Sequence, residues 1–142
     1  MHILKTEQIK HSANQMYQLV NDISSYPEFI PWCSKAIILD GEPDSWMLAK
    51  LTFEFHGISQ SFTTRNILIN QNTIEIKLVN GPFDHLEGIW SFSDTALGSE
   101  ICLDLEYQFT SSWLSSVFEP AFRQVSEMLV DSFKNRAQEI YG

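Results

Sequence analysis

A long run of alternating apolar and polar residues, from Cys33 to Phe109, most constrains what this chain can fold into. Alternation with a period of two is typical of β-strands that have one buried and one solvated face. Turn-forming residues interrupt the run at intervals, for example at residues 70–72 and 80–82. The run therefore predicts an antiparallel sheet of short hairpins whose apolar side chains share one face.

The last part of the chain, from about residue 112 to residue 141, has the three- and four-residue spacing of a helix. Its apolar stripe is broader than a surface helix requires, so we expect this helix to cover the inner face of the sheet. Pro120 lies within the pattern and should kink the helix near Ser116 or mark the start of its straight part. The expected stripe comprises Leu114, Val117, Phe118, Ala121, Phe122, Val125, Met128, Leu129 and Phe133.

The N-terminal part supplies a first strand over residues 2–10 and a helical insert over residues 12–32. Ser12 and Gln15 have the spacing of a capping box at the start of this insert, and two prolines keep its second helix short. The element order predicts an α+β fold, with one domain over residues 1–142. In this helix-grip arrangement a curved antiparallel sheet of about seven strands surrounds a long C-terminal helix, and two short helices follow the first strand.

The charge of the chain limits its partners. It carries 18 acidic and 9 basic residues, for a net charge of −9, and the lysines and arginines form no cluster. Proteins that grip phosphates usually present a basic patch, so binding to DNA and charge-driven binding to RNA are disfavoured. Docking on a basic protein surface remains open. No apolar run approaches a membrane span, and the two cysteines form no motif, which favours a reduced cytoplasm.

The sequence offers little equipment for catalysis or for metal binding. On the predicted strand phases, the strand carboxylates point to the solvated face, at Glu54, Glu75, Glu87, Asp104 and Glu106. The four histidines, at 2, 11, 56 and 85, are isolated from one another. An enzyme needs titratable groups that converge in a cleft, and a metal needs clustered ligands. We therefore expect no catalytic residues, no metal and no cofactor, and keep a cyclase-like enzyme as the third possibility.

The inner face has the composition of an apolar ligand cavity with a few orienting polar groups. If Phe62 faces inward on the fourth strand, then Thr64 and Asn66 do as well. The alternative is an ordinary core packed without a void, which periodicity cannot distinguish from a hollow one. The predicted cavity residues are Phe53, Phe62, Thr64, Asn66, Trp90, Phe92, Tyr107, Phe118, Phe122, Met128 and Leu129.

Four aromatic residues outside the alternating faces are predicted to form the mouth of this cavity: Tyr26, Phe29, Trp32 and Phe83. Tyrosine and tryptophan suit a membrane interface, so this edge would allow transient membrane contact by a protein that is otherwise cytoplasmic, at the periphery of the inner membrane. The alternative is structural. The insert would then plug one end of the sheet, and Phe83 would anchor a tight turn.

The aromatic-proline segment 26–32 also carries a family resemblance, together with residues 57–58, 62–66, 81–83, Trp90 and the terminal residues 136–142. In combination these segments resemble the START-like (polyketide cyclase/dehydrase-like) superfamily, in its coenzyme-Q-binding branch. Within that branch the chain is most similar to the RatA-type ribosome-association toxins. The resemblance covers essentially the whole chain, and it implies the helix-grip fold and an apolar cavity.

The resemblance implies two functions, which are compatible in one protein. The first is non-catalytic binding of ubiquinone or a similar prenyl lipid in support of cellular respiration. Burial of one five-carbon isoprene unit is worth roughly 3 kcal/mol before ordering costs, so a few units suffice without a charged contact. The alternative is the toxin of a toxin–antitoxin module that binds the large ribosomal subunit and blocks subunit association.

Overall fold

The computed structural model has an α+β fold and describes residues 1–55 and 57–142, so His56 lies outside the described residues. The predicted order of elements is confirmed. In chain order, the elements are β1 (His2–Ile9), α1 (Ala13–Asn21), the 3₁₀ helix η1 (Ile23–Glu28), β2 (Cys33–Glu42), β3 (Trp46–Phe55), β4 (Ile58–Ile69), β5 (Thr73–Asn80), β6 (Phe83–Thr95), β7 (Gly98–Phe109) and α2 (Ser112–Tyr141).

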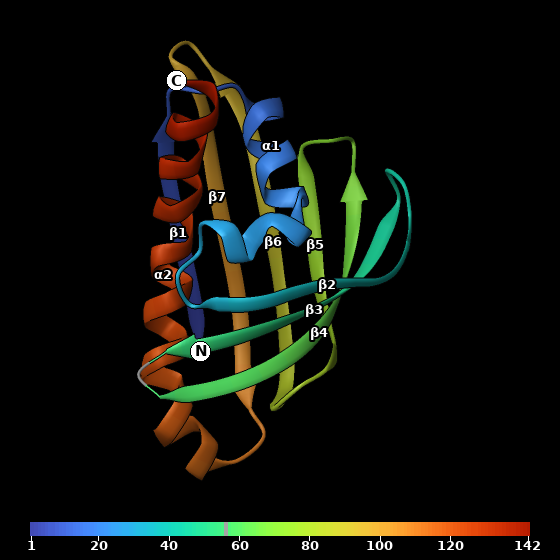
Figure 1. The fold of residues 1–142 in the computed structure, drawn as a ribbon, viewed down its shortest axis with the longest axis vertical. Helices are drawn as coiled ribbons and strands as arrows, with labels where there is room; N and C mark the ends of the chain where they lie inside the picture. Colours follow the sequence, from blue (N-terminus) through green and yellow to red (C-terminus); the bar gives the residue numbers. More distant parts are fainter. Residues whose placement is uncertain (56) are drawn as a thin grey trace.

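The strands form one seven-stranded sheet in the order β1-β7-β6-β5-β4-β3-β2, in which every pair is antiparallel. Consecutive strands are neighbours, except that β1 pairs with β7. The sheet bends strongly: β6 and β7 run along the length of the molecule, whereas β2, β3 and β4 cross it (Figure 1). Helix α2 lies lengthwise beside β1, and α1 and η1 cover the same side of the sheet (Figure 1). This is the predicted helix-grip arrangement.

Hydrogen bonds at the start of α1 fix the insert between β1 and β2. Ser12 and Gln15 form the predicted capping box, in which the Gln15 N–H donates to Ser12 Oγ at 3.2 Å and the Ser12 N–H donates to Gln15 Oε1 at 3.0 Å. The Ala13 N–H donates to Asp94 Oδ1 at 2.9 Å, which joins the start of α1 to the far end of β6. These contacts position η1, where Tyr26 is buried, at the crossing point of the bent sheet.

The strand faces agree with the predicted period of two. Along β6 and β7 the residues alternate between buried and accessible, and Trp90, Phe92, Leu103 and Tyr107 are all at most 3% exposed. On β4, Thr64 and Asn66 are buried and Arg65 is exposed, as the inward placement of Phe62 predicted. The Arg65 guanidinium lies 4.4 Å from the ring centroid of Trp46 on the outer face.

The predicted stripe of α2 was too broad. Val117 and Met128 are 38% and 41% exposed, so they lie on the solvent side of the helix. The buried residues are Ala121, Phe122, Val125, Ser126, Val130, Phe133 and Ala137, which recur every three or four positions. Pro120 does not end the helix, which is continuous from Ser112 to Tyr141.

Candidate functional site

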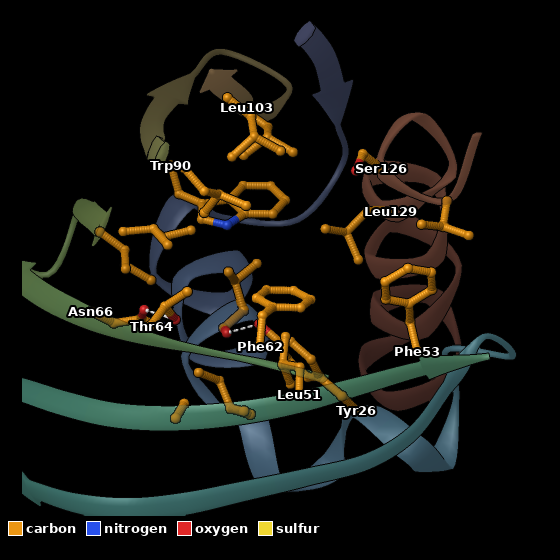
Figure 2. A pocket seen from close by; sticks show the side chains of 18 of the residues that line it. Tyr26, Leu51, Phe53, Phe62, Thr64, Asn66, Trp90, Leu103, Ser126 and Leu129 are labelled. Carbon is orange, nitrogen blue, oxygen red and sulfur yellow. Dashed lines mark hydrogen bonds between the residues drawn. The ribbon is translucent and has the colours of Figure 1, made fainter. Parts of the chain in front are cut away.

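A cavity of about 90 Å³ lies between the inner face of the sheet, η1 and α2. Trp90 and Leu103 lie across it from Phe62 and Leu51, and α2 closes one side with Ser126 and Leu129 (Figure 2). The whole lining consists of Val20, Ile23, Tyr26, Trp32, Ala49, Leu51, Phe53, Phe62, Thr64, Asn66, Ile74, Ile76, Leu86, Trp90, Leu103, Leu105, Phe122, Val125, Ser126 and Leu129.

Strand periodicity brings most of the wall together. Inward residues two positions apart on β3, β4, β6 and β7 line the cavity, because every second side chain faces the same way. The sharp bend of the sheet then sets the wall from β3 and β4 across from the wall from β6 and β7 (Figure 1). Side chains of the two walls therefore face each other over the cavity rather than pack side by side.

A pair of polar side chains lies on the β4 wall. Thr64 and Asn66 are 4% and 7% exposed, and the Thr64 hydroxyl donates a hydrogen bond to Asn66 Oδ1 at 2.9 Å. They are two positions apart on one strand, so both point into the cavity (Figure 2). The Asn66 carbonyl oxygen accepts from Thr64, and the Asn66 amide nitrogen can donate to a ligand that enters the cavity.

Tyr26 closes the η1 side of the cavity. Its hydroxyl donates to the Val20 carbonyl oxygen, which ties η1 to the end of α1. Burial is the main cause that raises the pKa of Tyr26 above its ordinary value, so the phenol stays neutral at physiological pH. None of the residues that line the cavity within the described chain carries a formal charge. The cavity is therefore neutral as well as apolar.

Most of the predicted cavity residues do line the cavity. Those that the structure brings together are Phe53, Phe62, Thr64, Asn66, Trp90, Phe122 and Leu129. Tyr26 and Trp32 were predicted to form its mouth, but both are 6% exposed and belong to its wall. The insert thus closes this end of the sheet and does not present an aromatic edge to solvent at these two positions.

Four predicted wall residues lie elsewhere. Phe92 packs against Tyr17 of α1, with ring centroids 5.7 Å apart, and Phe118 contacts Phe109 near the start of α2, at 6.4 Å. The predicted wall position of Met128 is wrong, because the residue lies on the outer side of α2. Tyr107 is fully buried, but its hydroxyl turns away to Glu119.

The two remaining mouth residues are packing anchors. Phe83 is 6% exposed and stacks on Phe109 at 4.7 Å, so it anchors the turn before β6, as the alternative interpretation had it. Phe29 packs against Phe133 at 5.6 Å, and the Arg136 guanidinium lies 5.0 Å from its ring centroid. Neither residue contributes to the lining.

Several lining residues escaped the sequence analysis. Val20 and Ile23 come from the insert, where they have the spacing of one helical face, and that spacing does not say which residues reach a cavity. Ser126 is 5% exposed on the buried side of α2. A signal for it existed, since Ser126 follows Phe122 by four residues and therefore shares its helical face. A small polar residue in a buried stripe marks a place where packing is incomplete.

A second polar group lies just outside the cavity, where β7 meets α2. The Tyr107 hydroxyl donates to Glu119 Oε1 at 2.9 Å, and Arg123 Nε donates to the same oxygen at 2.8 Å. Burial, and then the hydrogen bond to Glu119, raise the pKa of Tyr107 above its ordinary value. This network secures α2 to the sheet and keeps the Glu119 carboxylate out of the cavity.

Residues 1–55 and 57–142 contain no group of three or more His, Cys, Asp or Glu side chains that could hold a metal ion. Within the same part of the chain, no helix combines the length and the apolar character needed to cross a membrane.

Comparison with known proteins places this geometry in a family. A family model described as polyketide cyclase / dehydrase and lipid transport matches residues 9–134. The solved structure of the Zhui aromatase/cyclase from Streptomyces sp. R1128 superposes with a TM-score of 0.82, covering 100% of this chain and 96% of that one. The two sequences are 14% identical, so this likeness concerns the fold alone.

Two curated relatives are similar over nearly the whole chain. A Pseudomonas aeruginosa protein named ribosome association toxin RatA is 40% identical over 144 residues, covering 99% of this chain and 98% of that protein. The mitochondrial coenzyme Q-binding protein COQ10 of Dictyostelium discoideum is 28% identical over 141 residues, covering 96% of this chain and 69% of that protein.

Proposed function

Because the chain belongs to the polyketide cyclase/dehydrase and lipid transport family, as its motifs predicted, we propose that it binds a neutral prenyl lipid such as ubiquinone without catalysing a reaction. The observation that carries this proposal is the uncharged apolar cavity between the bent sheet and α2. Ligand sites are typically concave and apolar, with a small number of placed polar groups. The Thr64–Asn66 pair would orient the head of such a ligand.

The chemistry of the lining favours a lipid without charge. A carboxylate or phosphate head would lose its hydration without meeting a cation, because no lysine or arginine is among the described residues that line the cavity. A prenyl chain is uncharged, so it needs no cation in the cavity. Each methylene buried against Leu103, Leu105 or Val125 would contribute about 0.8 kcal/mol.

The cavity must widen to accept a lipid. Its volume of about 90 Å³ is below the range of roughly 300–1,000 Å³ that ligand sites occupy. Leu51, Phe62 and Leu129 line the cavity and are only half-buried, so they lie between it and solvent. We infer that these three side chains move aside when the lipid binds. The name of the coenzyme Q-binding relative supports a quinone as that lipid.

Lipid extraction tests this function directly. The protein would be purified without detergent, extracted with organic solvent and examined by mass spectrometry for quinones and other prenyl lipids. Added quinone should bind in a one-to-one ratio by equilibrium dialysis. The proposal is wrong if no lipid co-purifies and no added quinone binds.

We infer a second function, association with the large ribosomal subunit, from the relative named RatA at 40% identity. The net charge of −9 favours contact with a basic ribosomal protein over direct contact with rRNA. A protein with this function would act in the cytoplasm, and any contact that it makes with the inner membrane would be transient. Sedimentation of a lysate through a sucrose gradient with added protein tests it. Excess protein should reduce the 70S peak, and normal subunit joining would remove the support.

The proposal of a non-catalytic role rests on the lining itself. No carboxylate or histidine is among the residues that face the cavity within the described chain, so the usual general acids and bases are missing there. The aromatase/cyclase neighbour shares the fold at 14% identity, which does not extend to its reaction. Chemical turnover of a polyketide substrate by the purified protein would overturn this part of the proposal.

A further inference from the structure

Two side chains of the cavity lining carry a polar group that can only donate a hydrogen bond. Trp32 and Trp90 both line it, at 6% and 3% exposure. An indole N–H donates one hydrogen bond and cannot accept one. Trp32 Nε1 is buried and has no hydrogen-bond partner among the described residues. The nitrogen edge of the Trp90 ring faces the interior of the cavity (Figure 2), and the described residues supply it with no acceptor.

Asn66 adds a third donor. Its Oδ1 accepts from the Thr64 hydroxyl at 2.9 Å, and its amide nitrogen can donate to a ligand in the cavity. Ser126 lies across the cavity on α2, and its hydroxyl can either donate or accept. Thr64, Asn66 and Ser126 each have a side-chain oxygen that can still accept a hydrogen bond, whereas the two indole N–H groups can only donate.

Buried donors without acceptors are unfavourable, and a ligand that supplies acceptors relieves them. We propose that the cavity selects a neutral ligand whose polar groups accept hydrogen bonds and do not donate them. For a lipid quinone, this means that the oxidised form, with two carbonyl oxygens, binds in preference to the reduced form. The two hydroxyl groups of a quinol need acceptors of their own, and among the described lining side chains these are limited to the oxygens of Tyr26, Thr64, Asn66 and Ser126. This inference rests on the proposed lipid-binding function and names which form of the lipid is bound.

Three ligands with the same decyl tail separate this proposal from its alternatives: decylubiquinone, its quinol kept reduced under nitrogen, and the dimethyl ether of that quinol. The ether has acceptors and no donors, and it lacks the electron-poor ring of the quinone. Affinities are measured by equilibrium dialysis, because a quinone and a quinol quench tryptophan fluorescence to different extents. We expect the quinone and the ether to bind about fivefold more tightly than the quinol, the equivalent of one neutral hydrogen bond.

Two indole variants assign the effect to the cavity. Trp90→Phe keeps an aromatic ring and removes the N–H, so it should weaken binding of the quinone and the ether about fivefold. Binding of the quinol, whose hydroxyl oxygens can also accept from an indole, should weaken by a smaller factor. Trp32→Phe should act in the same direction and serves if Trp90→Phe fails to fold. The matched control is Trp113→Phe, because Trp113 is 68% exposed at the start of α2, away from the cavity. It should not change any of the three affinities.

The outcomes distinguish the inference from the function on which it rests. Equal binding of quinone and quinol, or tighter binding of the quinol, would overturn the selection and leave lipid binding intact. A quinone that binds tightly beside an ether that binds as weakly as the quinol would also overturn it, since ring electronics would then decide. If none of the three ligands binds, the lipid-binding function fails and the inference fails with it.

Discussion

The Tyr107 hydroxyl donates a hydrogen bond to the Glu119 carboxylate at 2.9 Å, across the junction between β7 and α2. Tyr107 is fully buried, and Glu119 is also held by Arg123 one helical turn later. Pro120 follows Glu119 and removes a backbone N–H from this part of the helix. The tyrosine therefore supports α2 beside a position that lacks one backbone hydrogen bond, next to the side of the cavity that the helix closes.

Replacing Tyr107 with phenylalanine should lower the free energy of unfolding by about 1.5 kcal/mol, because a hydrogen bond to a charged acceptor is lost. Urea denaturation followed by far-ultraviolet circular dichroism measures this change. The control is Tyr141→Phe, which removes a long, exposed contact of 3.4 Å to the Gln15 carbonyl oxygen. Equal destabilisation by the two variants would contradict the role given to the Tyr107 hydroxyl.

Stability should fall at alkaline pH in a way that depends on Tyr107. Burial raises the pKa of this phenol in the folded protein, whereas in the unfolded chain it titrates near its ordinary value of about 10. Its contribution is therefore complete below about pH 10 and is lost as the pH rises further, by up to about 1.4 kcal/mol per pH unit. Tyr26 adds a loss of the same sign.

Urea denaturation of the wild type and Tyr107→Phe between pH 8 and pH 11.5 isolates the contribution of Tyr107 ionisation to the free energy of unfolding. The stability difference between the two proteins should be constant up to about pH 9.5 and should shrink above it. A difference that stays constant over the whole range would show that the Tyr107 pKa is the same in the folded and unfolded states.

The two cysteines should differ strongly in reactivity. Cys33 is 3% exposed, and burial raises the pKa of its thiol to about 11. At a given pH the folded protein should therefore hold about 100-fold less thiolate at Cys33 than an ordinary cysteine does. Cys102 is only half-buried, so iodoacetamide at pH 8 should label it first, as peptide mapping by mass spectrometry would report. Equal labelling is expected only after denaturation, and equal labelling of the folded protein would refute the prediction.

The sequence predicted the sheet well, and the helix less well, for a physical reason. A period of two assigns each strand residue to one of two opposite faces, so Trp90 and Asn66 were placed correctly from pattern alone. A helix distributes its residues at 100° steps, and residues at the edge of a wide stripe are ambiguous. Val117 and Met128 were both such edge residues, and both are exposed.

The periodicity of the sequence could not predict whether the interior of the fold is hollow. A void depends on the summed volumes of side chains from many elements, and the helical spacing of Val20 and Ile23 does not show that they reach the cavity. The direction of a polar group is equally hidden, as Tyr107 shows. Its position on β7 was correct, but its hydroxyl bonds with Glu119 and does not point into the cavity.

Ser126→Leu should reduce lipid binding in the cavity without destabilising the fold. Ser126 is 5% exposed, lines the cavity and makes no hydrogen bond to another described residue, so its replacement breaks none of the described bonds. The added methine and two methyl groups would occupy much of the 90 Å³ volume. At about 0.8 kcal/mol per buried CH₂, the unliganded protein should keep its stability or gain up to about 2 kcal/mol, while lipid binding falls at least tenfold.

The control is Ser132→Leu, the same change on α2 at a position outside the cavity, which should leave binding intact. Thermal unfolding and equilibrium dialysis with decylubiquinone supply the two readouts. Undiminished lipid binding by a folded Ser126→Leu protein would mean that the ligand lies elsewhere on the molecule.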